Sequence, residues 1–146
     1  MAMQTSRDGM RAIPYDECVS LLRENQHGVG RIAVIHQRRP RIFPVNFVMS
    51  DDRVLFCTDE GTKLDAAWRK SLVEFELDHV DLVARTGWSV VVAGRATVVT
   101  DESLVMLLGS HRLQPFAPGP KRHWVVIEPD EISGRRVGGS SGGWIR

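Results

Sequence analysis

The sequence predicts a mainly β protein of the α+β class, a small antiparallel barrel of six strands with two or three short helices. Six segments are rich in apolar and β-branched residues, as strands are, and polar or glycine-containing stretches separate them. Only short helices are expected between them, which favours an antiparallel sheet that closes on itself. The six segments are residues 31–35, 41–49, 54–57, 73–77, 87–99 and 124–127.

Length and charge indicate one globular domain. A chain of 146 residues is long enough to bury roughly two-thirds of its unfolded surface. With 19 basic and 18 acidic residues, the net charge of +1 gives no support for a nucleic-acid partner or a membrane anchor. The N-terminus lacks the apolar segment of a signal peptide, so we expect a cytoplasmic protein. Residues 1–12 should be flexible, 13–137 should form the domain, and 138–146 should be a flexible Gly/Ser-rich tail.

The first helix is expected to begin at Pro14, because proline suits the first turn of a helix. Cys18, Leu21 and Leu22 follow at helical spacing and form one apolar stripe. The helix should end between residues 25 and 28, before the first strand.

Two strands joined by a tight turn form the centre of the chain. The apolar runs 45–49 and 54–57 flank the polar residues 50–53, which is the pattern of a β-hairpin. An earlier turn over residues 36–40 should join the first strand to this hairpin. Helical spacing then begins at Leu64 and predicts a short helix.

Two further strands are predicted after the short helix. Residues 73–77 alternate between apolar and acidic side chains, as in a strand with one face in water. A polar connection over 81–86 precedes the longest strand candidate, 87–99. Gly94 within it indicates a bulge or bend, for which we expect a positive φ.

The last part of the domain combines a short helix, a loop and a strand. Asp101 is expected to cap a helix that runs to Leu108. The prolines of residues 114–120 exclude regular structure there, so this stretch should be an exposed loop. The final core strand, 124–127, is expected to end before Pro129.

The connection between the second hairpin strand and the short helix has the composition of an anion site. Thr58 ends the strand, Gly61 and Thr62 follow, and Lys63 directly precedes the helical pattern from Leu64. Backbone N–H groups, the positive end of a helix dipole and an ammonium group would converge on a bound anion there.

These residues resemble a known family. The sequence P-V-N-F at residues 44–47, the hairpin turn, the apolar strand and T-x-x-G-T-K-L at 58–64 are similar to the flavin-binding core of the pyridoxamine phosphate oxidase-like family. The resemblance extends from Gly30 to about Glu128. It implies a six-stranded antiparallel split β-barrel that binds FMN between the two subunits of a homodimer.

The resemblance also implies roles for particular residues. Lys63 and its neighbours would hold the flavin phosphate, helped by an arginine near the first barrel strand. Backbone and side chains of P-V-N-F would lie beside the flavin ring, and the tryptophan of G-W-S-V-V-V would reach the cofactor from the partner subunit. The implied cofactor-binding residues are Arg31, Val45, Asn46, Phe47, Thr58, Gly61, Thr62, Lys63 and Trp88.

Each of these residues also has a simpler explanation. Lys63 is equally consistent with a solvated lysine, although a cation at a helix N-terminus opposes the dipole and so favours a nearby anion. Asn46 is unusual in a strand interior, and its side chain could simply bond to backbone. Trp88 would suit a core or an interface. Arg31 and Arg41 are also typical of charges that protect strand edges.

Several chemistries find no support in the sequence. Cys18 and Cys57 do not form a C-x-x-C pair and are expected to be reduced thiols, although spacing alone leaves a bridge open. The five histidines show no metal-ligand spacing, so no metal site is predicted. The chain has no P-loop, no G-x-G-x-x-G and no G-x-S-x-G, which disfavours kinases, Rossmann dehydrogenases and α/β-hydrolases.

The functional prediction is an FMN-binding homodimer that acts as a flavin-dependent oxidoreductase on a small molecule, with no catalytic residue identified. Two alternatives stay open: a deazaflavin-dependent reductase, and a non-catalytic module that binds flavin or haem. The dimer is also expected because Phe47, Trp68, Trp88 and Trp124 offer more apolar surface than a core of this size readily covers.

Overall fold

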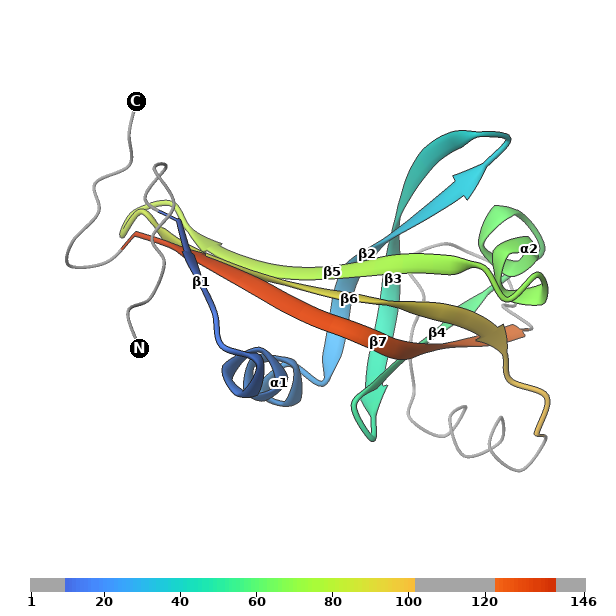
Figure 1. Ribbon diagram of the computed structural model, residues 1–146, viewed down its shortest axis with the longest axis horizontal. Coiled ribbons are helices and arrows are strands. Elements are labelled where there is room, and N and C mark those ends of the chain that lie inside the picture. Colours follow the sequence, from blue (N-terminus) through green and yellow to red (C-terminus); the bar gives the residue numbers. More distant parts are fainter. Residues whose placement is uncertain (1–9, 102–122, 139–146) are drawn as a thin grey trace.

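The structure is a computed structural model that describes residues 10–101 and 123–138 (Figure 1). The helix expected after Asp101, the loop expected at 114–120 and most of the two terminal segments lie outside the described residues. Two helices and seven strands are described. In chain order they are β1 Met10–Ala12, α1 Tyr15–Glu24, β2 His27–His36, β3 Arg39–Ser50, β4 Arg53–Thr58, α2 Thr62–Trp68, β5 Leu72–Asp81, β6 Thr86–Val98 and β7 His123–Val137.

The strands form one antiparallel sheet that closes on itself. Its order is β1-β7-β4-β3-β2-β5-β6, and β6 also pairs with β7, so six strands complete a ring. This confirms the predicted antiparallel split barrel. The seventh strand, β1, was not predicted: residues 10–12 of the segment expected to be loose pair with residues 135–137 of β7. The three-residue strand has no sequence pattern of its own and depends on that pairing.

Two tight turns connect the central strands. Gln37 and Arg38 between β2 and β3, and Asp51 and Asp52 between β3 and β4, all have positive φ between 50° and 63°. Two consecutive residues with positive φ form the hairpin turn whose twist matches that of the flanking strands. The predicted central hairpin is therefore confirmed, and the earlier turn is shorter than the predicted 36–40.

The strand β7 is much longer than predicted. It continues through Pro129 to Val137, whereas the sequence indicated an end before that proline. Ala93 lies opposite Glu131 and Gly94 lies opposite Pro129, so Asp130 is one extra residue on β7. Proline is tolerated in a sheet at a bulge, because a ladder hydrogen bond is missing there in any case.

Gly94 is required for close backbone approach at this bulge. The predicted bulge is confirmed, but Gly94 is not among the glycines with positive φ. A Cβ built at Gly94 would lie 1.8 Å from the carbonyl oxygen of Glu128. The expected reason for glycine was therefore wrong: the position excludes a side chain because the two strands come too close, not because of a left-handed backbone.

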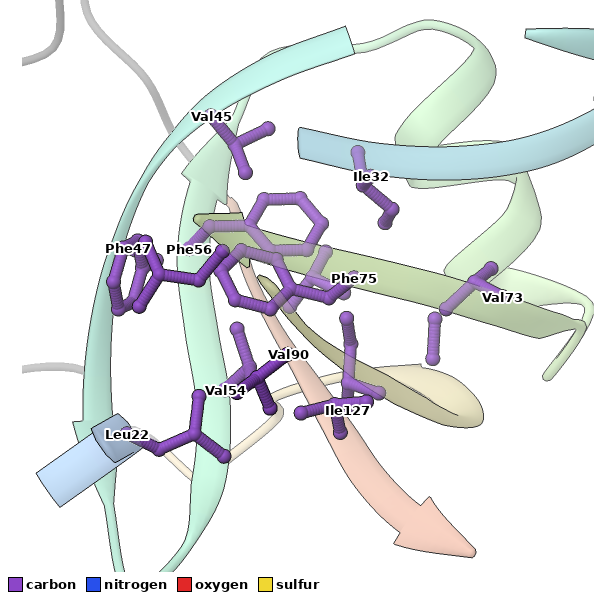
Figure 2. Close-up of a cluster of buried hydrophobic side chains, with 14 of the residues drawn as sticks. Leu22, Ile32, Val45, Phe47, Val54, Phe56, Val73, Phe75, Val90 and Ile127 are labelled. Atoms are coloured by element: carbon purple, nitrogen blue, oxygen red, sulfur yellow. The ribbon is translucent and has the colours of Figure 1, made fainter. Parts of the chain in front are cut away.

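The barrel interior is a continuous apolar core. Figure 2 shows the side chains of Phe47, Phe56, Phe75 and Ile127 converging from different strands. Phe47 and Phe75 meet edge to face, with ring centroids 4.9 Å apart and planes at 64°. A Cβ at Gly30 would lie 2.3 Å from the Phe75 ring, so this glycine makes room for the aromatic pair.

The four aromatic residues expected at an interface differ in how much of their side chains is exposed to solvent. Phe47 is fully buried and Trp124 is only 7% exposed, since the latter packs with Leu55 and Val126 in a second cluster on the outer side of β4 and β7. Trp88 is partly buried against the core, and Trp68 at the end of α2 is 57% exposed. The chain itself therefore covers two of the four.

We predict that Gly94→Val destabilises the fold. The new side chain would have to displace the backbone of Glu128, so the loss should exceed the roughly 1 kcal/mol of a change in intrinsic propensity and reach about 3 kcal/mol or more. Chemical denaturation of parent and variant measures it. Ala93→Val adds similar volume to the neighbouring position of β6 and serves as the matched control. Equal stability of the two variants would contradict the close-approach explanation.

Candidate functional site

Lys63 lies where α2 meets the end of the barrel. It is the second residue of α2, which buries Leu64, Ala66 and Ala67 against the sheet. The ammonium nitrogen of Lys63 lies 4.5 Å from the centroid of the Phe43 ring on β3. A cation over an aromatic face is held in place by the ring quadrupole. Lys63 therefore has a defined position and is half-buried, unlike a freely solvated lysine.

The loop before α2 leaves its backbone accessible. Gly61 has a φ of 142°, and a Cβ built there would have no atom within 4 Å. No side chain caps the start of α2, although the first amides of any helix lack intrahelical partners. With only seven residues, α2 supplies a small dipole. An anion at this loop would be held mainly by the charge of Lys63 and by backbone N–H groups.

The two threonines of the motif differ in what they present. Thr58 is 2% exposed, and its hydroxyl donates a hydrogen bond to the Asp59 carbonyl oxygen at 3.2 Å. In this conformation Thr58 shapes the turn and does not offer its hydroxyl to a ligand. Thr62, the first residue of α2, is half-buried beside Lys63.

The P-V-N-F residues on β3 alternate between two faces. Val45 and Phe47 point into the barrel and are buried in the core (Figure 2). Asn46 lies on the outer face of the sheet, opposite Val29 of β2. A ligand on the outer face could therefore contact the Asn46 side chain, but would reach Val45 and Phe47 only through their backbone.

Arg31 lies on the outer face of β2, next to the neighbouring strand β5. Its guanidinium pairs with Glu76 at 3.1 Å and with Asp78 at 3.5 Å. The neighbouring residue Ile32 pairs with Phe43, and successive residues of a strand point to opposite faces. The structure therefore does not bring the Arg31 side chain to the face where Lys63 lies over Phe43.

The carboxylates beside Arg31 affect each other. Partial burial raises the pKa of Glu76 above its ordinary value, and the neighbouring Asp78 carboxylate raises that pKa further. The Arg31 guanidinium acts in the opposite direction without cancelling the rise. The outer face of β5 thus carries more negative charge than Arg31 balances.

Trp88 lies at the opposite end of the molecule from Lys63. It pairs with His79 of β5 and Arg136 of β7, on the part of the sheet that extends beyond the barrel (Figure 1). The other end of β6 reaches α2, where Ala96 donates a backbone hydrogen bond to Ser71. The eight residue-to-residue steps of strand from Trp88 to Ala96 span about 26 Å. One chain therefore does not bring Trp88 and Lys63 together.

Sequence reasoning missed Phe43 and the partners of Arg31. Phe43 precedes the buried Val45 and Phe47 at two-residue spacing on β3. This alternation could have placed the Phe43 side chain on the same face as theirs. The pairing of Arg31 with Glu76 depends on the register between β2 and β5, which no local pattern shows.

Other kinds of site find no support in the described residues. Among residues 10–101 and 123–138, no group of three or more His, Cys, Asp or Glu side chains could hold a metal ion. Cys18 and Cys57 are free thiols, Cys18 buried and Cys57 partly so. No described helix is long and apolar enough to cross a membrane.

Comparison with known proteins adds a family match. The model of the pyridoxamine 5'-phosphate oxidase family matches residues 14–136. An uncharacterised protein of Mycobacterium tuberculosis is 36% identical over 127 residues, which cover 84% of this chain and 82% of that relative.

Solved structures share both the fold and part of the sequence. An FAD-binding protein from Mycobacterium smegmatis is 39% identical with a TM-score of 0.65, over 86% of this chain and 97% of that one. A conserved protein of unknown function from Corynebacterium diphtheriae is 32% identical with a TM-score of 0.68, over 89% of this chain and 99% of that one.

The raised pKa of Glu76 predicts a pH-dependent stability. The folded chain binds this proton more tightly than the unfolded chain, so the contribution is favourable at low pH and is lost as pH rises from the ordinary carboxyl value through the raised pKa. Glu76→Gln, which resembles the protonated form, should gain thermal stability relative to the parent as the pH rises above the ordinary carboxyl value of about 4. Glu74→Gln, on the same face of β5, is the control. A difference from the parent that does not change with pH would contradict this prediction.

Proposed function

The chain belongs to the pyridoxamine 5'-phosphate oxidase family, and we propose on that basis that it binds a flavin nucleotide whose first phosphate contacts Lys63. The observation that carries the proposal is the position of Lys63, held over Phe43 beside the open backbone at Gly61. The FAD-binding protein of M. smegmatis, at 39% identity, supports a flavin as the cofactor.

The residues at this site fit a flavin phosphate. A phosphate needs positive charge and several hydrogen-bond donors, which one ammonium and adjacent backbone N–H groups supply. Thr62 adds a hydroxyl at the first position of α2. The fit extends to space, because the absence of any atom within 4 Å of a Cβ at Gly61 leaves room beside the loop.

The part of the cofactor that these residues recognise is FMN, which is also one half of FAD. FMN is therefore the minimum ligand of the proposal, and a deazaflavin is the alternative. The absorbance spectrum of the purified protein distinguishes them, because a deazaflavin and haem do not share the bands of FMN and FAD. A colourless protein should acquire flavin bands on reconstitution.

We propose that the complete site forms in a homodimer. Trp88 and Lys63 are too far apart in one chain for both to contact a single flavin ring and its phosphate, so one of them would come from the partner subunit. Apolar side chains that are more than half exposed, as interface residues of a separated subunit are, occur on α2 and the strand that follows it, and on the face of the β2–β3 hairpin opposite to Phe43. They are Ile35, Ile42, Trp68 and Leu72.

The proposed activity is oxidation or reduction of a small molecule. A bound flavin supplies the hydride chemistry, and the contribution of this chain is to bind the flavin, orient it and limit access of water. Turnover with a reduced nicotinamide separates an enzyme from a non-catalytic flavin- or haem-binding module. Bleaching of the flavin bands followed by reoxidation by a second substrate would support the enzyme.

We predict that Lys63→Ala weakens FMN binding much more than riboflavin binding. Riboflavin has no phosphate, and a charge-assisted contact of about 1.5–3 kcal/mol corresponds to roughly a ten- to hundredfold loss of affinity. Raised salt should reproduce part of the defect, because it screens a half-exposed contact. Fluorescence titration of both flavins measures it.

The control is Arg69→Ala, which removes a cation from the other end of α2. It should leave both affinities close to those of the parent. Equal losses of FMN and riboflavin in Lys63→Ala would assign Lys63 to the fold or the ring, and no loss of either would show a solvated lysine.

A second prediction is that the protein is a dimer in solution. Light scattering at micromolar concentration should give twice the chain mass of 16.4 kDa. Trp68→Ser, which removes an exposed aromatic residue, should shift the equilibrium toward the monomer, whereas Tyr15→Ser on the outer side of α1 should not. A parent protein with the mass of one chain would refute the shared site.

A further inference from the structure

The hairpin of β2 and β3 extends beyond the barrel as a basic arm, which we define as residues 34–43. Pairing of β2 with β5 ends at Ala33, and pairing of β3 with β4 begins only at Phe47. The arm is therefore a two-stranded ribbon that projects on the same side as α2 (Figure 1). No acidic residue occurs between Glu24 and Asp51, so the arm contains arginines without carboxylates.

Three arginines of the arm have no ion-pair or hydrogen-bond partner among the residues that the structure describes. Arg38, Arg39 and Arg41 form no ion pair and no side-chain hydrogen bond with any residue in the described part of the chain. Elsewhere, most described arginines are engaged by a carboxylate or a backbone carbonyl oxygen. The engaged ones with assigned partners are Arg11, Arg23, Arg31, Arg53, Arg95 and Arg136.

Arg39 and Arg41 lie on the same face of β3 as Phe43, over which Lys63 lies. Arg41 pairs with Val34 and Phe43 pairs with Ile32, so Arg41 and Phe43 are two positions apart on one face of β3. Their Cα atoms are separated by about 7 Å along the strand. Arg39 is two positions further out on the same face. Lys63, Arg41 and Arg39 thus form a row of cations that leads away from α2.

We propose that Arg41 binds the second phosphate of a dinucleotide flavin, so that FAD is the preferred cofactor and its adenylate half lies along the arm. The inference rests on the proposed contact of Lys63 with the first phosphate. The two phosphates of FAD share one bridging oxygen, so neighbouring cations on one face can each contact one of them. The planar guanidinium binds phosphate oxygens through two parallel hydrogen bonds.

The competing explanation is protection of strand edges. Both edges of the arm are open, and charged side chains discourage pairing of such edges with other chains. That role would need charge but no particular face, and it would leave flavin affinity independent of Arg41. The two explanations therefore differ in one measurable quantity, the ratio of FAD affinity to FMN affinity.

The test is calorimetric titration of the full-length protein with FAD, FMN and riboflavin. The parent should bind FAD about tenfold or more tightly than FMN, as expected for one added charge-assisted contact at an exposed position. Arg41→Gln should remove most of that tenfold difference and leave FMN affinity within about twofold of the parent. Arg39→Gln should act in the same direction with a smaller effect.

The matched control is Arg23→Gln, which removes the same charge at the other end of β3, beside Asp52. It should leave the FAD-to-FMN ratio unchanged. A parent that binds FMN as tightly as FAD, or an Arg41→Gln protein that loses FMN and FAD affinity equally, would overturn the inference while leaving the flavin site intact. Failure of all three flavins to bind would overturn the proposed function as well.

Discussion

The pairing of β6 with β7 is the interaction on which the rest of the molecule depends. It runs along nearly the whole of β6 and turns an open sheet into a ring. One position limits it: at Gly94 the two backbones come so close that a single added carbon would overlap the Glu128 carbonyl group. Along its other edge β7 pairs first with β4, at residues 123–127, and then with β1, at residues 135–137, while β6 remains its neighbour on both sides of the bulge.

This closure also determines where functional groups can lie. Because β6 and β7 continue past the barrel, they carry Trp88 far from the end that α2 covers. Lys63 and Phe43 meet at the α2 end, where the seven-residue helix is anchored by its buried apolar face. In the proposed homodimer, a ligand that contacts both ends would be shared between two chains. The division of the proposed site would then follow from strand length and not from the site residues themselves.

Local patterns predicted six of the seven described strands, the central hairpin and the bulge, because each of these depends on residues close in sequence. Long-range register explains what was not predicted. The partners of Arg31 depend on β2 meeting β5, and the continuation of β7 through Pro129 depends on a bulge opposite Gly94. Thr58 and Asn46 show a related limit: the motif identified them, but the phase of each strand decided that Thr58 turns inward and Asn46 outward. Membership of a motif does not fix the direction of a side chain.

Although the net charge is only +1, acidic and basic side chains gather on different parts of the molecule. The outer face of β5 holds Glu74, Glu76 and Asp78, and Arg31 pairs with the last two of them. The arm, by contrast, has no carboxylate within its own sequence. The acidic side chains of β5 share the face of Ala33 and Ile42, whereas Arg39 and Arg41 lie on the other face of the hairpin. Uncompensated arginines beside a positioned lysine leave charge available for an anionic ligand, and that availability, more than the helix dipole, distinguishes this end of the barrel.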